Sequence, residues 1–371
     1  MIIEKKRRTK NSRIVVAISG GVDSSVAAAL LKKKNYDVVG IFLKFWSPYA
    51  KAASDKTTRR ENICCNQEAL FSARQVAAKL EIPFYVLDVS KEFKREVVDY
   101  YIREYENGRT PNPCVVCNKK IKFGWLMEKA KELGAKYLAT GHYARIKNNK
   151  LLKAKDKKKD QTYFLWQLSQ DQLKHILFPI GDYTKQEVRA LAKKFGLHVA
   201  EKRESQDICF IEKGKNNDFL AHYARKLLKP GKIVDSKGKL LGIHKGSVFY
   251  TLGQRHGLTG IQLKRQTGGF EPAYVIKLEP GKNRVIIGSK RDLYNNKLEV
   301  KNINLLSKWP TVLACQASIR YGHPAESCRI TKLLNCRQIK VVFDKPQCAI
   351  TPGQSIVFYK GNEVIGGGII K

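Results

Sequence analysis

A glycine pair flanked by serines and an aspartate is the first part of the chain whose residue types favour chemistry. The segment reads Ser19-Gly-Gly-Val-Asp-Ser-Ser25. Gly20 and Gly21 tolerate a sharp turn and let backbone N–H groups approach an anion closely, while the serines add hydroxyl donors. Asp23 can hold a magnesium ion or orient a nucleotide. The pattern predicts a phosphate site, and the alternative is a glycine turn that binds no ligand.

The spacing of this segment excludes two common nucleotide motifs. No Gly-Lys-Ser/Thr follows the glycines, so it is not a Walker A loop, and it is not the G-x-G-x-x-G fingerprint. The segment resembles the PP-loop of ATP pyrophosphatases, which adenylate a substrate oxygen and release pyrophosphate. The resemblance implies that ATP is bound here together with Mg²⁺, which Asp23 can help to hold.

Two thiols, Cys114 and Cys117, lie three residues apart where the segment Thr110-Pro-Asn-Pro turns into a basic helix predicted for residues 121–133. A helix N-terminus beside lysines stabilises a thiolate, so Cys117 is a candidate nucleophile. The alternative for this pair is half of a zinc site that the adjacent Cys64 and Cys65 would complete. A third thiol, Cys209, lies in the segment Glu204-Ser-Gln-Asp-Ile-Cys-Phe-Ile211, where the default for an isolated cysteine is an inert buried thiol.

These motifs taken together resemble the tRNA-specific 2-thiouridylase (MnmA) family, and the likeness runs nearly from end to end. The matching motifs are S-G-G-V-D-S-S, T-P-N-P-x-x-x-C-N-x-x-I-K-F, A-T-G-H-Y, S-Q-D-I-C-F and T-P-G-Q. The resemblance implies a sulfurtransferase that adenylates the 2-oxygen of the wobble uridine (U34) of tRNA and replaces it with sulfur. The products are 2-thiouridine, AMP and pyrophosphate.

In this family the two cysteine motifs have different roles, which fall here on Cys117 as nucleophile and on Cys209 as carrier of a persulfide. The persulfide sulfur attacks the activated uridine while Cys117 forms a disulfide with Cys209, or Cys117 releases free hydrosulfide that attacks instead. Both routes stay open. Either one requires the two thiols to converge in space, which their separation along the chain permits.

The resemblance also assigns binding residues. Those for ATP are Ala17, Ile18, Ser19, Gly20, Gly21, Val22, Asp23, Ser24, Leu43 and Gly141. Those for tRNA are Asn112, Pro113, Cys114, His142, Lys159, Asp160, Gln161, Arg320, Tyr321 and Gln354. The chain departs from the family at Cys114, where Asp is common, and at Gly322, where Arg is frequent. The acid/base role at Cys114 is therefore open, with a second resolving thiol as the alternative.

Alternating strand and helix patterns must position these residues in the first half of the chain. We predict strands at residues 13–18, 37–43, 83–89 and 137–140, and helices at 22–31, 67–80, 93–105, 121–133 and 188–195. Thr184-Lys-Gln-Glu187 is a capping box for the last helix. The lysine-rich run 153–159 is either a solvated loop or an RNA contact. The pattern and the resemblance predict an α/β parallel-sheet PP-loop (adenine nucleotide alpha hydrolase-like) domain over residues 1–205.

The second half of the chain is predominantly β. Short alternating runs punctuated by Gly, Pro and Asn predict strands that include residues 273–278, 284–287, 339–343 and 355–359. We expect a small, mainly β central domain over residues 206–280 and a C-terminal β-barrel over residues 281–371 that binds tRNA. Four cysteines in this half, Cys315, Cys328, Cys336 and Cys348, are expected to be packing residues.

Composition narrows the partners and the compartment. The 371 residues include 70 Lys+Arg against 33 Asp+Glu, a net charge of +37 that favours a nucleic-acid partner, although a general lysine bias is the alternative. No apolar run approaches the roughly 20 residues of a membrane helix. Nine cysteines without a signal-peptide pattern indicate a reducing compartment, so we expect the cytoplasm.

The expected partners are the anticodon region of tRNA and a cysteine desulfurase or sulfur-relay protein, with no membrane association and a monomeric chain. Two other functional classes compete with the thiouridylase hypothesis. A PP-loop ligase or amidotransferase would make AMP without needing Cys209. A non-catalytic zinc- and RNA-binding protein would bind zinc and release no pyrophosphate.

Overall fold

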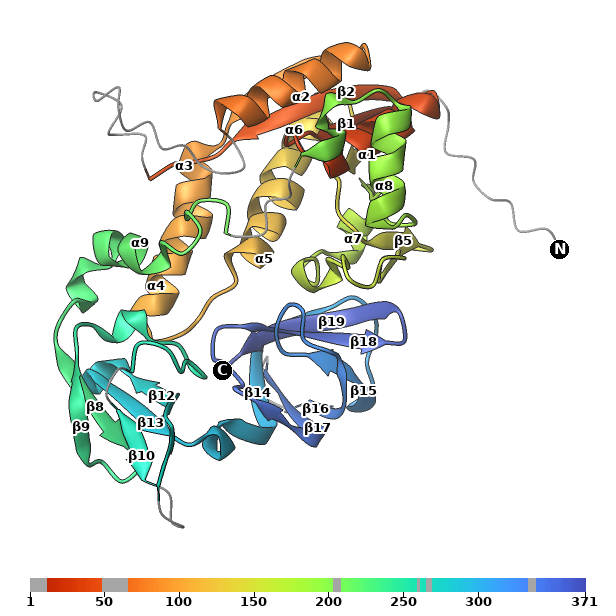
Figure 1. The fold of residues 1–371 in the computed structure, drawn as a ribbon. Helices are drawn as coiled ribbons and strands as arrows, with labels where there is room; N and C mark the ends of the chain where they lie inside the picture. Colours follow the sequence, from red (N-terminus) through yellow and green to blue (C-terminus); the bar gives the residue numbers. More distant parts are fainter. Residues whose placement is uncertain (1–11, 49–65, 203–207, 259–260, 265–268, 333–337) are drawn as a thin grey trace, which may run out of the picture. The chain divides into compact units, whose positions relative to one another are not determined.

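A computed structural model describes residues 12–48, 66–202, 208–258, 261–264, 269–332 and 338–371. The chain divides into two compact units (Figure 1). The first unit comprises Met1–Glu96, Cys114–Glu212 and Asn362–Val364. The second comprises Val97–Pro113, Lys213–Gly361 and Ile365–Lys371.

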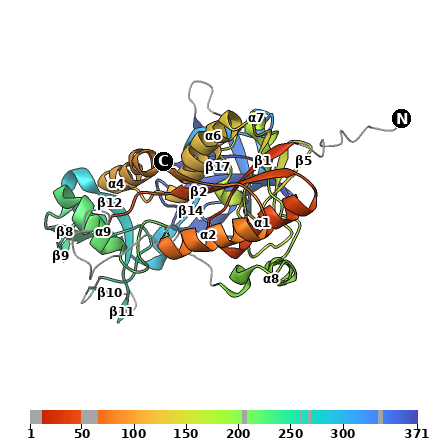
Figure 2. The ribbon, with the colours of Figure 1, turned by 90° about the horizontal axis from the view of Figure 1, so that it is seen from above.

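A five-stranded parallel sheet in the order β3-β2-β1-β4-β7 forms the centre of the first unit. Its strands are β1 (Arg13–Ala17), β2 (Asp37–Lys44), β3 (Phe84–Asp88), β4 (Tyr137–Ala139) and β7 (Ile176–Leu177). The β-branched run Ile14 to Val16 is fully buried, because helices cover both faces of a parallel sheet. Figure 2 shows α1 (Val22–Lys33) and α2 (Gln67–Lys79) on one side of the strands and α6 (Leu126–Glu132) on the other.

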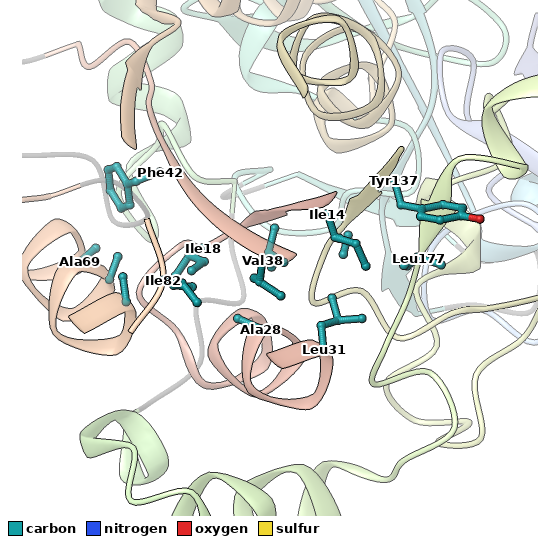
Figure 3. Close-up of a cluster of buried hydrophobic side chains, with 14 residues drawn as sticks. Ile14, Ile18, Ala28, Leu31, Val38, Phe42, Ala69, Ile82, Tyr137 and Leu177 are labelled. Atoms are coloured by element: carbon teal, nitrogen blue, oxygen red, sulfur yellow. The ribbon is translucent and has the colours of Figure 1, made fainter. Parts of the chain in front are cut away.

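An apolar cluster of the first unit lies between the sheet and helices α1 and α2 (Figure 3). Ile14 and Ile18 of the β1 region meet Ala28 of α1 and Ala69 of α2 in this cluster. The opposite side of α1 packs on α8 (Lys185–Lys194) through Val26 and residues of α8. Because α1 is covered on two sides, apolar residues surround nearly its whole circumference.

Two predicted helices contain π-helical segments and differ from the sequence-based bounds. Residues 93–105 are present as α3 (Ser90–Phe93), a π segment (Lys94–Val98) and α4 (Asp99–Glu106). The helix predicted at 121–133 begins earlier, as α5 (Pro113–Cys117), a π segment (Asn118–Trp125) and α6. Pro113 at its first position explains the earlier start, because proline has no N–H to lose in the first turn.

Short elements complete the first unit. They are the antiparallel hairpin β5 (Arg145–Lys147) and β6 (Lys150–Leu152), α7 (Gln170–Leu173), and the 3₁₀ segments Thr162–Phe164 and His198–Glu201. The capping box predicted at the start of α8 is present. The Thr184 side chain accepts from the N–H of Glu187, and the Glu187 side chain accepts from the N–H of Thr184.

The second unit contains a four-stranded sheet in the order β12-β13-β8-β9. Its strands are β8 (Gly231–Asp235), β9 (Leu240–His244), β12 (Tyr274–Glu279) and β13 (Arg284–Gly288). Nearby in the sequence are α9 (Asn216–Tyr223), the hairpin β10 (Gln262–Lys264) and β11 (Phe270–Pro272), and the 3₁₀ segments Arg225–Leu227, Ser247–Phe249, Pro280–Lys282 and Lys290–Leu293. The sheet extends past residue 280, because β13 pairs with both β12 and β8. The three domain ranges themselves stay predictions.

Six antiparallel strands close into a barrel in the second unit. They are β14 (Tyr294–Leu305), β15 (Val312–Ser318), β16 (Glu326–Lys332), β17 (Gln338–Cys348), β18 (Ser355–Lys360) and β19 (Glu363–Ile370). The order β14-β17-β16-β15-β18-β19 returns to β14, because β14 also pairs with β19. The predicted fold class, a parallel-sheet domain followed by a small central domain and a C-terminal β-barrel, is confirmed. Within the described ranges, no helix is long and apolar enough to cross a membrane.

Candidate active site

The predicted phosphate loop joins β1 to α1 through a turn that requires glycine at one position. Gly20 has a φ of +73°, in the left-handed region. A Cβ atom at Gly20 would lie 2.1 Å from the carbonyl oxygen of Ala69 in α2. Because L side chains disfavour this φ and the clash would be with backbone, Gly20 permits both the turn and the close approach of α2.

Serine hydroxyls hold the loop against the first turn of α1. The N–H of Ser19 donates to Ser24 Oγ over 3.1 Å, and the two hydroxyl oxygens lie 3.2 Å apart. Ser25 Oγ donates to the carbonyl of Gly21 over 2.7 Å. Gly21 is the N-cap residue and has no side chain with which to cap the first-turn N–H groups. These donors and the positive end of the helix dipole suit an anion.

The turn after β4 meets the same part of α1. A Cβ atom at Gly141 would lie 2.5 Å from the backbone nitrogen of Ser24 and 2.7 Å from the carbonyl carbon of Asp23, so Gly141 packs directly on the first turn. Leu43 is buried in β2, the strand beside β1. The structure thus brings Gly141 to the loop, while binding of ATP by these residues stays a prediction.

Asp23 has two partners that the sequence did not indicate. Lys185 Nζ donates to Asp23 Oδ1 over 2.7 Å and to Oδ2 over 2.9 Å. The hydroxyl of Tyr143 also donates to Asp23 Oδ1, over 2.8 Å. The only sequence signal near Lys185 was the capping box that begins α8, and a capping box says nothing about a partner 162 residues away.

This arrangement does not fit a magnesium ion held by Asp23. Both carboxylate oxygens accept hydrogen bonds from an ammonium group, which occupies the positions that a cation would take. In the described part of the chain, no group of three or more His, Cys, Asp or Glu side chains could hold a metal ion. Cys64 and Cys65, which the zinc alternative requires, lie outside the described residues.

His142, predicted to contact tRNA, is buried in the structure. Its ring lies 5.8 Å from the ring centre of Phe123 and 5.9 Å from that of Phe178, and its Nδ1 lies 2.7 Å from Thr140 Oγ1. Burial, together with the positive charge of Lys122, lowers the pKa of His142 well below 6.5. The imidazole is therefore neutral at physiological pH, and its contact with tRNA stays a prediction.

The cysteine pair lies at the start of the helix that crosses from α5 into a π segment. Cys114 is partly exposed in the first turn, and Cys117 is 7% exposed at the last position of α5. Gly124 lies in the π segment, where a Cβ atom would come within 2.8 Å of the carbonyl oxygen of Lys119. π-helical turns occur often at functional sites, because they redirect the side chains around them.

Cys209 lies in the same unit as this pair and is partly exposed. The next residue, Phe210, is buried with its ring 5.7 Å from that of Phe93, and this contact anchors the segment. Residues 203–207, which begin the same motif, lie outside the described ranges. The persulfide and nucleophile roles of Cys209 and Cys117 stay predictions.

Two of the predicted tRNA residues in the first unit stabilise the loop that contains them. The Asp160 carboxylate accepts from the N–H of Ala154 over 2.8 Å and from Thr162 Oγ1 over 2.6 Å, while burial raises the pKa of Asp160. Gln161 Oε1 accepts from the N–H of Tyr143 over 2.9 Å. Lys159 is partly buried. Asp160 and Gln161 therefore give the loop its shape, whether or not they also meet RNA.

Three of the predicted tRNA residues of the second unit flank the ends of barrel strands, namely Arg320 and Tyr321 after β15 and Gln354 before β18. Gln354 Nε2 donates to the carbonyl of Thr110 over 2.8 Å, just before Asn112 and Pro113 in the chain. Arg320 donates to the carbonyls of Cys348 and Ala349, over 3.1 and 2.8 Å. The side chain of Tyr321 is 46% exposed, which leaves an aromatic surface that can stack on a base.

Three family profiles match successive parts of the chain. They are described as the tRNA methyl transferase HUP domain over residues 12–213, the tRNA methyl transferase PRC-barrel domain over residues 217–289, and the aminomethyltransferase beta-barrel domain over residues 295–370. The first profile alone spans more than half of the chain.

Full-length relatives agree with these profiles. A tRNA-specific 2-thiouridylase MnmA of Clostridium perfringens is 45% identical over 366 residues, with 97% of this chain and 98% of the relative covered. A tRNA-specific 2-thiouridylase MnmA 1 of Caldanaerobacter subterraneus is 47% identical over 370 residues, with 97% and 98% covered. The MnmA of Halothermothrix orenii is 47% identical over 366 residues, with 97% and 99% covered. With these identities over nearly its whole length, the chain belongs to the tRNA-specific 2-thiouridylase (MnmA) family.

Proposed function

We propose that this chain is a tRNA sulfurtransferase that converts the wobble uridine U34 into 2-thiouridine. ATP adenylates the 2-oxygen of the uridine, and sulfur from a cysteine persulfide replaces that oxygen, giving AMP and pyrophosphate. The observation that carries the proposal is identity of 45–47% over nearly the full length to proteins named tRNA-specific 2-thiouridylase. The anion-binding loop and the thiols of the first unit supply groups that this chemistry needs.

The activation step uses the loop between β1 and α1. The N–H groups of the first turn of α1 and the hydroxyl groups of Ser19 and Ser24 bind and orient the phosphates. The 2-oxygen of uridine attacks the α-phosphorus, the bond to pyrophosphate breaks, and the oxygen becomes part of an AMP leaving group. Gly141 lets the chain after β4 lie against this turn without a side chain in the way.

The sulfur step uses the two thiols that the family motifs assign. The terminal sulfur of a Cys209 persulfide attacks C2 of the uridine and AMP leaves. The thiolate of Cys117 then attacks Cys209 Sγ, which releases the sulfur on the uridine and leaves a Cys117–Cys209 disulfide that an external thiol must reduce. In the second route, the Cys117 thiolate first attacks Cys209 Sγ, which forms the same disulfide and releases hydrosulfide. The hydrosulfide then attacks C2 of the uridine and AMP leaves.

The proposed partners follow from this chemistry. The anticodon region of tRNA presents U34, and a cysteine desulfurase or sulfur-relay protein supplies the persulfide sulfur. We propose that the reaction takes place in the cytoplasm, where the redox balance keeps thiols reduced, and that the enzyme acts as a monomer. The proposed contacts with tRNA are Asn112, Pro113, Cys114, His142, Lys159, Asp160, Gln161, Arg320, Tyr321 and Gln354.

The test is an assay with the full chain, ATP, a persulfide donor and unmodified tRNA. Nucleoside mass spectrometry should detect 2-thiouridine, and pyrophosphate should appear with it. Cys117→Ser and Cys209→Ser should abolish the thionucleoside, because each removes one sulfur of the relay. Cys348→Ser, a partly exposed thiol of the barrel, is the matched control and should retain activity.

Two outcomes would reject the proposal in different ways. Pyrophosphate release that is undiminished in Cys209→Ser, without any thionucleoside, would favour a ligase or amidotransferase that uses another nucleophile. Stoichiometric zinc without pyrophosphate release would favour a non-catalytic RNA-binding protein.

A further inference from the structure

Asp23 and Lys185 form a partly buried ion pair at the phosphate loop. The Lys185 side chain is only 12% exposed and that of Asp23 is 31% exposed. The ammonium donates to both carboxylate oxygens, and it also lies 5.8 Å from the ring centre of Tyr143. Burying a lysine costs free energy unless a partner compensates its charge, so this ammonium needs an anion at this position.

The backbone fixes where the ammonium lies. Lys185 is the first residue of α8, and its N–H donates to Asp156 Oδ2 over 3.0 Å. The capping box at Thr184 and Glu187 sets the start of the same helix. Val188 of α8 then packs in one apolar cluster with residues of α1. The start of α8 is thereby held against the start of α1, and Lys185 reaches the anion-binding turn from outside the loop motif.

A carboxylate in the first turn of α1 opposes the binding of a polyphosphate, because like charges repel at short range. Asp23 keeps a second donor, the Tyr143 hydroxyl, when the lysine turns to another anion. An ammonium has three N–H donors and can bridge a carboxylate and a phosphate. Resting on the ATP use proposed above, we propose that Lys185 is a further nucleotide-binding residue, whose ammonium binds a phosphate of ATP from its place beside Asp23.

A double-mutant cycle on the full chain separates this role from simple charge balance. ATP and adenosine affinities are measured by calorimetry for the wild type, Lys185→Gln, Asp23→Asn and the double variant. Lys185→Gln should weaken ATP binding by at least about tenfold, the usual loss for a charge-assisted hydrogen bond, and leave adenosine binding unchanged. Asp23→Asn should not restore ATP binding to Lys185→Gln, because the phosphate would still lack its cation.

Controls keep the result interpretable. Lys155→Gln removes an exposed lysine that pairs with Glu187 of α8, and it should leave ATP affinity unchanged. Lys185→Arg keeps the charge and should lose much less affinity than Lys185→Gln, which covers the case in which the glutamine variant does not fold. Full ATP affinity in Lys185→Gln, or in the double variant with Asp23→Asn, would overturn this inference but not the proposed function. A wild type that binds no ATP would overturn the proposed activation step as well.

Discussion

His142 illustrates, at the scale of one residue, how the fold decides the charge of a functional side chain. The ring packs against Phe123 and Phe178, and its hydrogen-bond partner is the neutral hydroxyl of Thr140. Burial disfavours the charged imidazolium, and Lys122 adds a repulsive positive charge. The neutral imidazole is the form that this environment stabilises.

We predict that His142 stays neutral at pH values where an exposed histidine is protonated. Because its folded-state pKa lies below 6.5 while the unfolded chain binds a proton near 6.5, the free energy of unfolding should fall as the pH drops through this value, by up to about 1.4 kcal/mol per pH unit. Imidazole NMR titration, with the signal assigned from its loss in His142→Gln, is the direct measurement. A His142 signal that titrates near pH 6.5 would contradict the prediction.

Residues differ in how far the sequence could predict their positions. The sharp turn at Gly20 could be predicted, because a glycine pair between a strand and a helix indicates unusual dihedrals, but the close contact of Gly20 with Ala69 could not. The pairing of Asp23 with Lys185 could not, since it depends on how α8 packs on α1. The burial of His142 was also unpredictable, because Phe123 and Phe178 come from distant parts of the chain.

At the scale of elements, the parallel sheet follows from the sequence, while the helix bounds around the thiols do not. The run Ile14 to Val16 and the alternation after it predicted the buried strand and its neighbours. The helix predicted from residue 121 begins at Pro113, so Cys114 and Cys117 lie inside a helix rather than before it. A proline-rich segment looks like a loop in sequence, but proline is also favourable at the first position of a helix.

Two glycines with the same backbone conformation allow the phosphate turn to be tested against a matched control. Gly20 and Gly134 have φ values of +73° and +71°, but a Cβ atom at Gly20 would clash with Ala69, whereas nothing lies within 4 Å at Gly134. Gly134→Ala should lower the free energy of unfolding only by the backbone strain, about 1 kcal/mol. Gly20→Ala should cost more and should abolish ATP binding. Urea unfolding measures the stability of each variant, and calorimetry measures its ATP affinity. Equal losses of stability in Gly20→Ala and Gly134→Ala would contradict the role of the close contact with Ala69.

At the scale of the whole molecule, the excess of 37 positive charges is the property that bears most on tRNA. Many lysines already have acidic partners, such as Lys129 and Lys131, which pair with Glu132 and Glu128 on α6. The total of 70 Lys+Arg therefore overstates the number of cations that can contact phosphates, whereas the net charge of +37 already subtracts the acidic residues. The exposed members of the lysine-rich run 153–159 contact either RNA or solvent.

Salt dependence resolves this alternative, because each phosphate contact adds about 0.7 to 0.9 to the slope of log affinity against log salt concentration. Lys157 and Lys158 are exposed beside Asp160 and Gln161, which shape their loop. If the run contacts tRNA, as we predict, replacing both lysines by glutamine should lower the slope by about 1 to 2. Fluorescence anisotropy across a salt series measures the slope, with Lys129→Gln/Lys131→Gln as a control of equal charge change. Because only a contact changes the number of counterions released, identical slopes for the two double variants would assign the run to solvent.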